Sequence, residues 1–321
     1  MEEVEANISG ISENLAESIV EQKAEIANRK QLGALHGLRV AISVSENEEL
    51  EQLGLSENHI KDISVELARY LIVNGAKMLY GGDLRNGGFT ELFSELSYQY
   101  KYLSDKEPRF INYFPFPNSQ MISTSVRAKF YKQQVEPRIL AIPKYLGEID
   151  QEKKYVPFES VEDRYIVAEC LTDMRTTMTI YSDARIILGG RRKNFVGYFP
   201  GIVEETFQSL KACKAIYLIG GFGGATKSVI DIILGNKPNQ LSNDYQFDTT
   251  FLKEFRTYAT EKMAFDLDYD HLVDFFGNYS IESISKLNGL EVWENEILFE
   301  STNIHEIVFL IMKGLRKIGN S

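Results

Sequence analysis

The chain has 321 residues, of which 44% are hydrophobic, and it carries a formal net charge of -11 at pH 7. A chain of this size can bury the core of one large globular domain or of two smaller ones. The acidic balance disfavours a general nucleic-acid or anionic-membrane binder, because such proteins present a basic face, but it leaves room for a locally basic pocket.

Residues 1–36 are predicted to form a helical N-terminal arm, because isoleucine and leucine recur at near-helical intervals between charged residues. The first core strand is predicted at 39–45. A helix follows and ends near Asn74, with Gly75 as its C-terminal stop. A short second strand at 77–80 then precedes a second helix.

A third strand is expected at 109–114, where two prolines stop it. The polar and aromatic stretch up to residue 160 is left open, as a lid or as a subunit contact. The pattern then alternates again, with these predicted elements: helix 161–181, strand 185–188, helix 201–211, strand 215–219 and helix 225–234. From residue 245 the pattern is helical, with one possible strand pair near 290–299.

Strands that alternate with helices of this length predict an α/β fold, a Rossmann-like, doubly wound and mostly parallel sheet. We expect this nucleotide-binding domain to cover 37–240. Residues 241–321 are expected to form a mainly helical extension that acts as a cap or an interface.

Paired glycines follow three of the predicted strands, where ligands bind in open α/β sheets. They are Gly81, Gly82, Gly87 and Gly88, then Gly189 and Gly190, then Gly220, Gly221, Gly223 and Gly224. Glycine permits positive φ and lets a ligand approach the main chain. One cluster alone could be an ordinary turn, but three at one sheet edge favour a ligand cleft. None of them matches the Walker or dinucleotide-binding fingerprint.

Basic residues lie in or beside these loops: Arg85, Arg175, Arg191, Arg192 and Lys193. A guanidinium can donate two parallel hydrogen bonds to phosphate oxygens, so several of these residues could hold a diphosphate. Arg192 and Lys193 are better explained as solvated loop charges. Arg175 differs because it lies beside Met174 and Met178, which mark the buried face of its helix. A positive charge there needs an anion or a carboxylate partner.

Glu204 and Glu205 fall in the first turn of a helix that Pro200 and Gly201 open. Acidic residues are favoured there by the helix dipole by about 0.3–1 kcal/mol without any function. Alternatively, one carboxylate accepts hydrogen bonds from ribose hydroxyls, or acts in N-glycosidic cleavage. Further ligand contacts are predicted at Ser43, Ser45 and Phe222, the last of which could stack on a base.

Together these residues resemble the SLOG superfamily over about residues 38–234. This superfamily includes the LOG-type phosphoribohydrolases, the DNA-processing protein DprA, and ligand-sensing domains of bacterial conflict systems and TRPM channels. The LOG motif is Pro-Gly-Gly-x-Gly-Thr-x-x-Glu, preceded by an Arg-Lys pair. The matching residues are Gly189, Gly190, Gly201 and Glu205.

The chain also departs from the LOG motif. Leu188 replaces the proline and Ile202 the threonine, while Met174 stands in the Arg slot and Arg175 in the Lys slot. A long basic and aromatic loop, 191–200, replaces a single residue. The resemblance therefore implies a divergent branch that senses an ADP-ribose-like or cyclic ADP-ribose-like ligand, rather than one that turns it over.

Two functions are accordingly expected. The first is a regulatory nucleotide-binding protein of bacterial antiviral defence or signalling, with an effector protein as its partner. The alternative is a nucleotide N-glycosidase, in which Glu205 and Arg175 would be catalytic. The resemblance also implies a homo-oligomer, a dimer or higher.

We expect no nucleic-acid partner and no membrane association, because no apolar run approaches the ~20 residues that cross a bilayer. No cofactor or metal is expected either, since Cys170, Cys213 and the four histidines form no cluster at ligand spacing. Cysteine usage and the polar N-terminus point to the cytoplasm.

Overall fold

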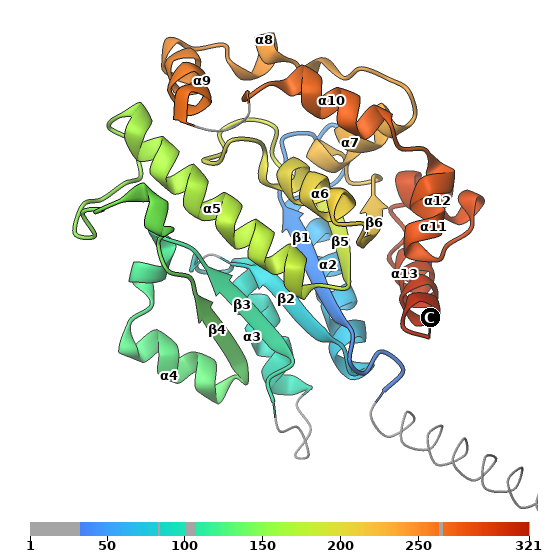
Figure 1. Cartoon of the computed structure of the whole chain (residues 1–321). Helices are drawn as coiled ribbons and strands as arrows, with labels where there is room; N and C mark the ends of the chain where they lie inside the picture. Colours follow the sequence, from blue (N-terminus) through green and yellow to red (C-terminus); the bar gives the residue numbers. More distant parts are fainter. Residues whose placement is uncertain (1–32, 83, 101–106, 263–265, 321) are drawn as a thin grey trace, which may run out of the picture.

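The computed structural model of the chain describes residues 33–82, 84–100, 107–262 and 266–320. Its centre is a sheet of six parallel strands in the order β4-β3-β2-β1-β5-β6 (Figure 1). The strands are β1 (Arg39–Ser45), β2 (Lys77–Gly81), β3 (Phe110–Phe114), β4 (Val135–Ile139), β5 (Ala184–Gly189) and β6 (Ala215–Ile219). The predicted Rossmann-like α/β fold is confirmed, and the described strands are parallel throughout.

The connections between the strands are helical. The α-helices of the described residues are α2 (Glu57–Val73), α3 (Phe89–Gln99), α4 (Thr124–Lys132), α5 (Val161–Tyr181), α6 (Gly201–Lys211), α7 (Gly224–Ile233), α8 (Asn243–Gln246), α9 (Thr250–Lys262), α10 (Tyr269–Gly277), α11 (Ile281–Asn288), α12 (Val292–Glu300) and α13 (Ile304–Ile318). The helices at 161–181 and 201–211 have the predicted bounds. None of the described helices is long and apolar enough to span a membrane.

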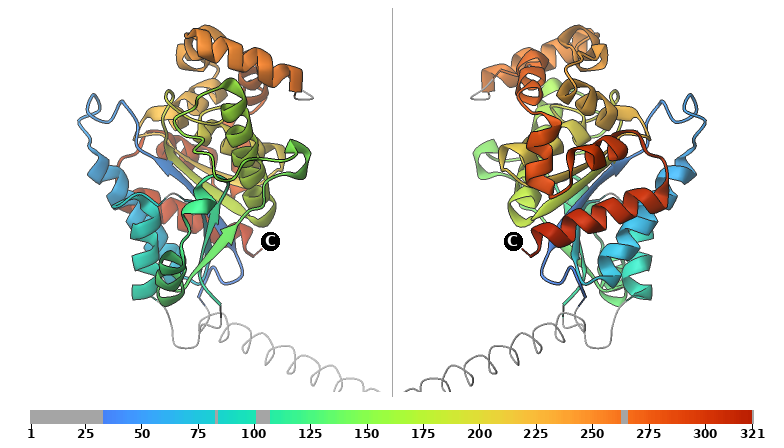
Figure 2. Two further views of the ribbon diagram at one scale, coloured as in Figure 1. Left: turned by 90° about the vertical axis from the view of Figure 1, so that its left-hand side faces the viewer. Right: turned by 90° about the vertical axis from the view of Figure 1, so that its right-hand side faces the viewer.

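The two faces of the sheet carry separate helix layers, because successive side chains of a strand point to opposite sides. Val40 and Ile42 pack with side chains of α2, α3 and α13 on one face. Ala41 packs on the other face under α5, and α6 lies beside α5 (Figures 1 and 2). The layer of α5 and α6 is the one that contains the candidate site.

Helix α5 is well specified by its sequence. Ser160 caps it by accepting a hydrogen bond from the Asp163 amide at 3.1 Å, a standard start for a helix. Met174 and Met178 are buried against β1, β2 and β3, which confirms the predicted buried face. Arg175, the neighbour of Met174, is thereby held at the junction of α5, α6 and the sheet.

The structure differs from the sequence-based expectation in two regions. The undecided stretch after residue 114 contains α4 and the edge strand β4, whose Pro137 is tolerated because an edge strand leaves one side unpaired. The possible strand pair near 290–299 is wrong, since α12 occupies this segment. There the Glu294 carboxylate accepts from the Glu291 amide and forms part of a capping box.

The C-terminal helices contribute to the cores on both faces of the sheet. Ile311 and Leu315 of α13 pack on the α2 side, and Phe255 and Phe276 pack on the other side. Helices α9 and α10 lie at the end of the molecule toward which β1 points (Figure 1). Most of the predicted N-terminal arm lies outside the described residues, and the divisions at residues 36 and 240 stay predictions.

Candidate functional site

Three glycine-bearing strand ends meet at one edge of the sheet, as predicted. Strand β2 ends at Gly81, β5 ends at Gly189, and Gly220 directly follows β6. Positive φ values between 66° and 97° occur at the end of β5 and at the start of α7, at Gly189, Gly190, Gly223 and Gly224. The backbone at these positions therefore does require glycine.

Protein atoms, however, fill the space beside these glycines. A Cβ on Gly189 would lie 2.4 Å from the carbonyl oxygen of Ser45, and one on Gly224 would lie 2.6 Å from that of Gly190. Other protein atoms crowd Gly190, Gly220, Gly221 and Gly223 in the same way. Phe222 is buried as well. These loops thus pack on one another and on their neighbours.

The loop after β2 is more open. Gly81 and Gly82 abut side chains of α5, α3 and β3, whereas Gly87 has no atom within 4 Å of the position of a Cβ. Gly88 is the N-cap of α3, and its amide donates to the carbonyl of Arg85 at 3.1 Å. The Arg85 side chain is exposed. This end of the sheet presents main chain and a cation to solvent.

A buried arginine that the sequence analysis did not select connects the sheet to the helices. Arg185 of β5 is fully buried, and its guanidinium donates to Ser43 at 2.9 Å, Ser209 at 2.8 Å and Thr179 at 3.1 Å. The carboxylate of Glu205 lies 3.4 Å from it. Ser43 and Glu205 are therefore partners of a protein cation.

Arg175 also has the carboxylate partner that its burial requires. Its Nη1 lies 2.5 Å from Oε2 of Glu204, and its Nε lies 3.8 Å from Oε1 of Glu205. A Cβ on Gly197 or on Gly201 would lie 2.9 Å from the guanidinium, so both glycines make room for it. The charge of Arg175 thus lies beside the first turn of α6.

The two glutamates that the sequence left as alternatives point in different directions. Glu205 faces Arg185 and the sheet. Glu204 is buried, accepts from Thr172 at 2.6 Å, and lines a cavity. Burial raises the pKa of Glu204 above its ordinary value of 4.5, although the charge of Arg175 and the hydrogen bond from Thr172 act against this.

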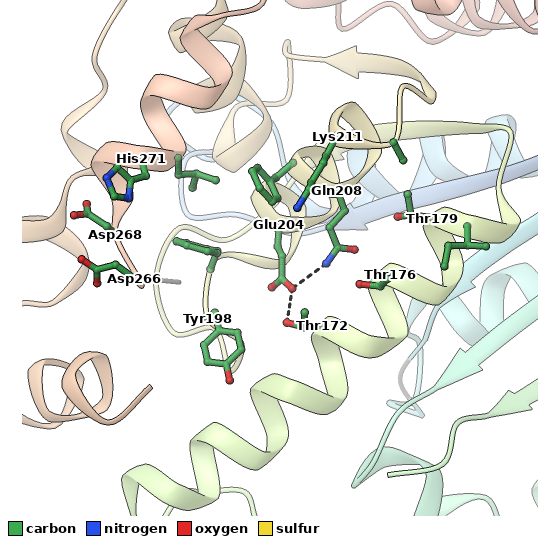
Figure 3. A pocket seen from close by; sticks show the side chains of 15 residues that line it. Thr172, Thr176, Thr179, Tyr198, Glu204, Gln208, Lys211, Asp266, Asp268 and His271 are labelled. Atoms are coloured by element: carbon green, nitrogen blue, oxygen red, sulfur yellow. Dashed lines mark hydrogen bonds between the residues drawn. The ribbon is translucent and has the colours of Figure 1, made fainter. Parts of the chain in front are cut away.

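The cavity lies between α5, α6 and α10 and has a volume of about 750 Å³, within the range of small-molecule sites (Figure 3). Glu204 and Gln208 lie in its wall, linked by a hydrogen bond of 3.3 Å. The remaining lining residues are Thr172, Thr176, Thr179 and Ile180 of α5, Tyr198 and Phe199 of the preceding loop, Phe207, Lys211 and Ala212 of α6 and its end, and Asp266, Asp268, His271 and Leu272 in or before α10. Apolar walls with a few converging polar groups suit an organic ligand.

The model of the SLOG cluster2 family matches residues 34–298 of this chain. The protein belongs to the SLOG cluster2 family. Searches of curated proteins and of solved structures returned no significant match. The resemblance seen in the sequence is confirmed, and membership implies binding of a nucleotide-related ligand at the level of the superfamily.

In this SLOG domain two of the residues that match the LOG motif, Gly201 and Glu205, lie beside Arg175. Gly201 begins α6 directly against the guanidinium, and Pro200, its N-cap, is buried. The first intrahelical bond at this end runs from the Glu204 amide to the Pro200 carbonyl at 3.0 Å. The amides of the preceding helical residues point out of the helix end, where an anion is favoured.

The loop 191–200, which enlarges the SLOG motif, is tied down at several points. Arg191 lies 3.6 Å from Glu46, and Arg192 is buried in contact with Glu49. Lys193 lies 2.7 Å from Asp248. The prediction of a solvated loop charge is therefore wrong for Arg192, because the carboxylate of Glu49 compensates its burial.

Sequence reasoning missed Arg185 and most of the cavity wall. The presence of an arginine within the otherwise apolar strand Ala184–Gly189 could have indicated that Arg185 is buried with polar partners. The threonines of α5 at 172, 176 and 179 recur at helical spacing, but such a stripe is also typical of a solvated helix face. Across the described ranges, no group of three or more His, Cys, Asp or Glu side chains is placed to hold a metal ion.

Proposed function

We propose that this SLOG domain binds an ADP-ribose-like or cyclic ADP-ribose-like ligand in the cavity between α5, α6 and α10. It would act as a sensor in bacterial antiviral defence or signalling, as a homo-oligomer that controls an effector protein. One observation carries the location: Glu204, a buried carboxylate paired with Arg175, lines an open cavity of about 750 Å³ in a member of a nucleotide-binding superfamily.

The chemistry of the cavity wall supports this ligand class. Oε1 of Glu204 accepts from Thr172 and Gln208, and Oε2 accepts from Arg175, so Oε2 keeps a lone pair for a sugar hydroxyl. Phe207 and Phe199 provide aromatic surface for a base. Lys211 supplies a cation, with its ammonium 5.8 Å from the ring centre of Phe207.

Calorimetry with ADP-ribose, cyclic ADP-ribose isomers and nucleoside monophosphates tests the proposal. Thr176 is exposed on α5 and lines the cavity, so Thr176→Trp should fill the cavity and abolish binding without disturbing the core. Thr257→Trp on α9 is the matched control, since Thr257 is exposed and does not line the cavity. Binding of none of these compounds at millimolar concentration would refute the proposal.

A second candidate, N-glycosidic cleavage of a nucleotide, is favoured by the raised pKa of Glu204. A carboxyl group with a raised pKa holds its proton more readily and can donate it to a leaving base. In this function Glu204, rather than Glu205, would face the substrate, with Arg175 holding it in place. Incubation with AMP and NAD, followed by chromatography, tests for release of free base. No base release would exclude this function, and base release that Glu204→Gln leaves unchanged would exclude the role of Glu204.

A further inference from the structure

The topological switch point of the sheet lies between β1 and β5. From β1 the chain adds β2, β3 and β4 outward on one side of the sheet, and from β5 it adds β6 on the other, so the loops that follow β1 and β5 diverge. In open parallel sheets this divergence creates the crevice that holds the ligand. In this protein two ion pairs connect the two loops across that place.

The two pairs, which we name the switch-point ion pairs, are Arg191–Glu46 and Arg192–Glu49. The acids come from the loop after β1 and the arginines from the loop after β5. Arg191 and Glu46 are 3.6 Å apart, and the Arg191 side chain is half exposed. The two loops are thus held together by charges that a ligand could rearrange.

Glu49 also occupies the place of an anion at the start of α7. Its Oε2 accepts a hydrogen bond of 2.9 Å from the amide of Gly224, the first residue of this ten-residue helix. Helix N-termini attract phosphates through such amides and through the helix dipole. A carboxylate of the chain itself therefore holds a position that suits a phosphate oxygen.

Arg192 is the second, independent feature of this place. Its side chain is only 5% exposed, and its guanidinium is aimed at the same carboxylate oxygen that Gly224 contacts. Its Nε has no hydrogen-bond partner within the described part of the chain. A buried guanidinium with an unused donor can bind a group that has more acceptors than one carboxylate oxygen.

We propose that the switch point is a phosphate-binding site that Glu49 occupies when no ligand is bound. A phosphate group replaces the Glu49 carboxylate on the Gly224 amide and on Arg192, and Glu49 turns to solvent. Its side chain is already 28% exposed, so this path is open. None of these residues lines the cavity beside α6, so the site is independent of the function proposed above.

The tethered carboxylate acts as an intramolecular competitor. A ligand that binds only when Glu49 has turned away has an apparent Kd equal to its intrinsic Kd divided by the population of that open state. If the open state is populated to roughly 10%, binding is weakened about tenfold. Glu49→Gln removes the competing charge and should strengthen binding of a phosphate by about this factor. It should also destabilise the fold, because Arg192 and α7 lose an anionic partner.

The experiment measures binding of inorganic pyrophosphate and of ADP-ribose by calorimetry, with urea unfolding in parallel. The matched control is Glu48→Gln, since Glu48 is an exposed neighbour without such contacts. We expect Glu49→Gln to bind pyrophosphate about tenfold more tightly than wild type, and Glu48→Gln to match wild type. Arg192→Met should lose binding of pyrophosphate, and if it fails to fold, Arg191→Met should still weaken that binding several-fold.

A binding site and a helix cap predict different results for Glu49→Gln. A binding site predicts tighter phosphate binding together with lower stability, whereas a helix cap predicts lower stability alone. If Glu49→Gln is less stable without binding more tightly, Glu49 only caps α7 and the proposal is overturned. The same holds if pyrophosphate binds neither wild type nor Glu49→Gln. Tighter binding of pyrophosphate identifies the phosphate as the recognised group, whether or not the binding of ADP-ribose also changes.

Discussion

Replacing Arg185 by methionine should strongly destabilise this protein. Methionine has a similar length and no charge, so it fills most of the space but deletes the donors to Ser43, Thr179 and Ser209. It also leaves Glu205 in the interior, where the nearest cation is Arg175 at 3.8 Å. Breaking a buried pair by removing one partner costs about 3–5 kcal/mol, so we expect a loss of about 4 kcal/mol in the free energy of unfolding.

The charge balance of the network predicts how a second substitution acts. Arg175 and Arg185 face Glu204 and Glu205, so the four groups are neutral together when both acids are ionised. Removing Arg185 alone leaves one excess negative charge, whereas Arg185→Met with Glu205→Gln restores neutrality. We expect the double variant to lose only about 2 kcal/mol, less than either single variant, because a buried charge without a partner is the main cost.

Urea unfolding of wild type, both single variants and the double variant measures this cycle. Arg127→Met, at an exposed position on α4, is the control and should change stability by less than about 0.5 kcal/mol. A loss below about 1 kcal/mol for Arg185→Met would contradict the argument. Strict additivity of the two single variants would also contradict it, since the guanidinium and the carboxylate would then not interact.

Three further predictions concern the loops and the C-terminal helices. Gly224→Ala should cost at least about 2 kcal/mol more than Gly235→Ala, because both need a positive φ but only Gly224 meets a carbonyl, and urea unfolding compares them. Burial would raise the pKa of Glu49, but the hydrogen bonds from Arg192 and Gly224 and the charge of Arg192 outweigh it, so the pKa lies below its ordinary value of 4.5. The stability that Glu49 contributes is therefore present above that value and lost as the pH falls through the lowered pKa. The difference between wild type and Glu49→Gln should shrink in acid, and a difference independent of pH would contradict this. Phe255→Ala should lower stability by about 3–4 kcal/mol in a single unfolding transition, and a separate early transition would instead show α9 to be an independent cap.

Elements with a strong hydrophobic period could be predicted from the sequence. Strand β5 and helices α5 and α6 are flanked by clear caps and glycines, and their bounds agree within a residue. Strand β4 could not be predicted, because Val135–Ile139 contains Glu136, Pro137 and Arg138, and only pairing with β3 makes it a strand. Tertiary contact, rather than local preference, decides such an edge strand.

The candidate site shows the same division. Glycine at Gly189 and Gly224 correctly indicated positive φ and a close approach of other atoms. The sequence cannot tell whether the approaching group is a ligand or the protein, because both require the same missing Cβ. Likewise, adjacent positions 204 and 205 are equivalent in the helix dipole, and only packing against α5 and β5 turns Glu204 to the cavity and Glu205 to Arg185.

In an acidic protein, carboxylates of the chain compete with a phosphate for the same cations. At this edge of the sheet five described cations lie beside a carboxylate, in the pairs Arg175–Glu204, Arg185–Glu205, Arg191–Glu46, Arg192–Glu49 and Lys193–Asp248. At these five positions a phosphate binds by replacing a carboxylate, and a compact ligand can do so at one loop at a time. A nucleic acid would have to displace several acids together along its backbone, against a net charge of -11. If the switch point exchanges anions as proposed, a small nucleotide needs one exchange, whereas a polymer of the same phosphates needs several at once.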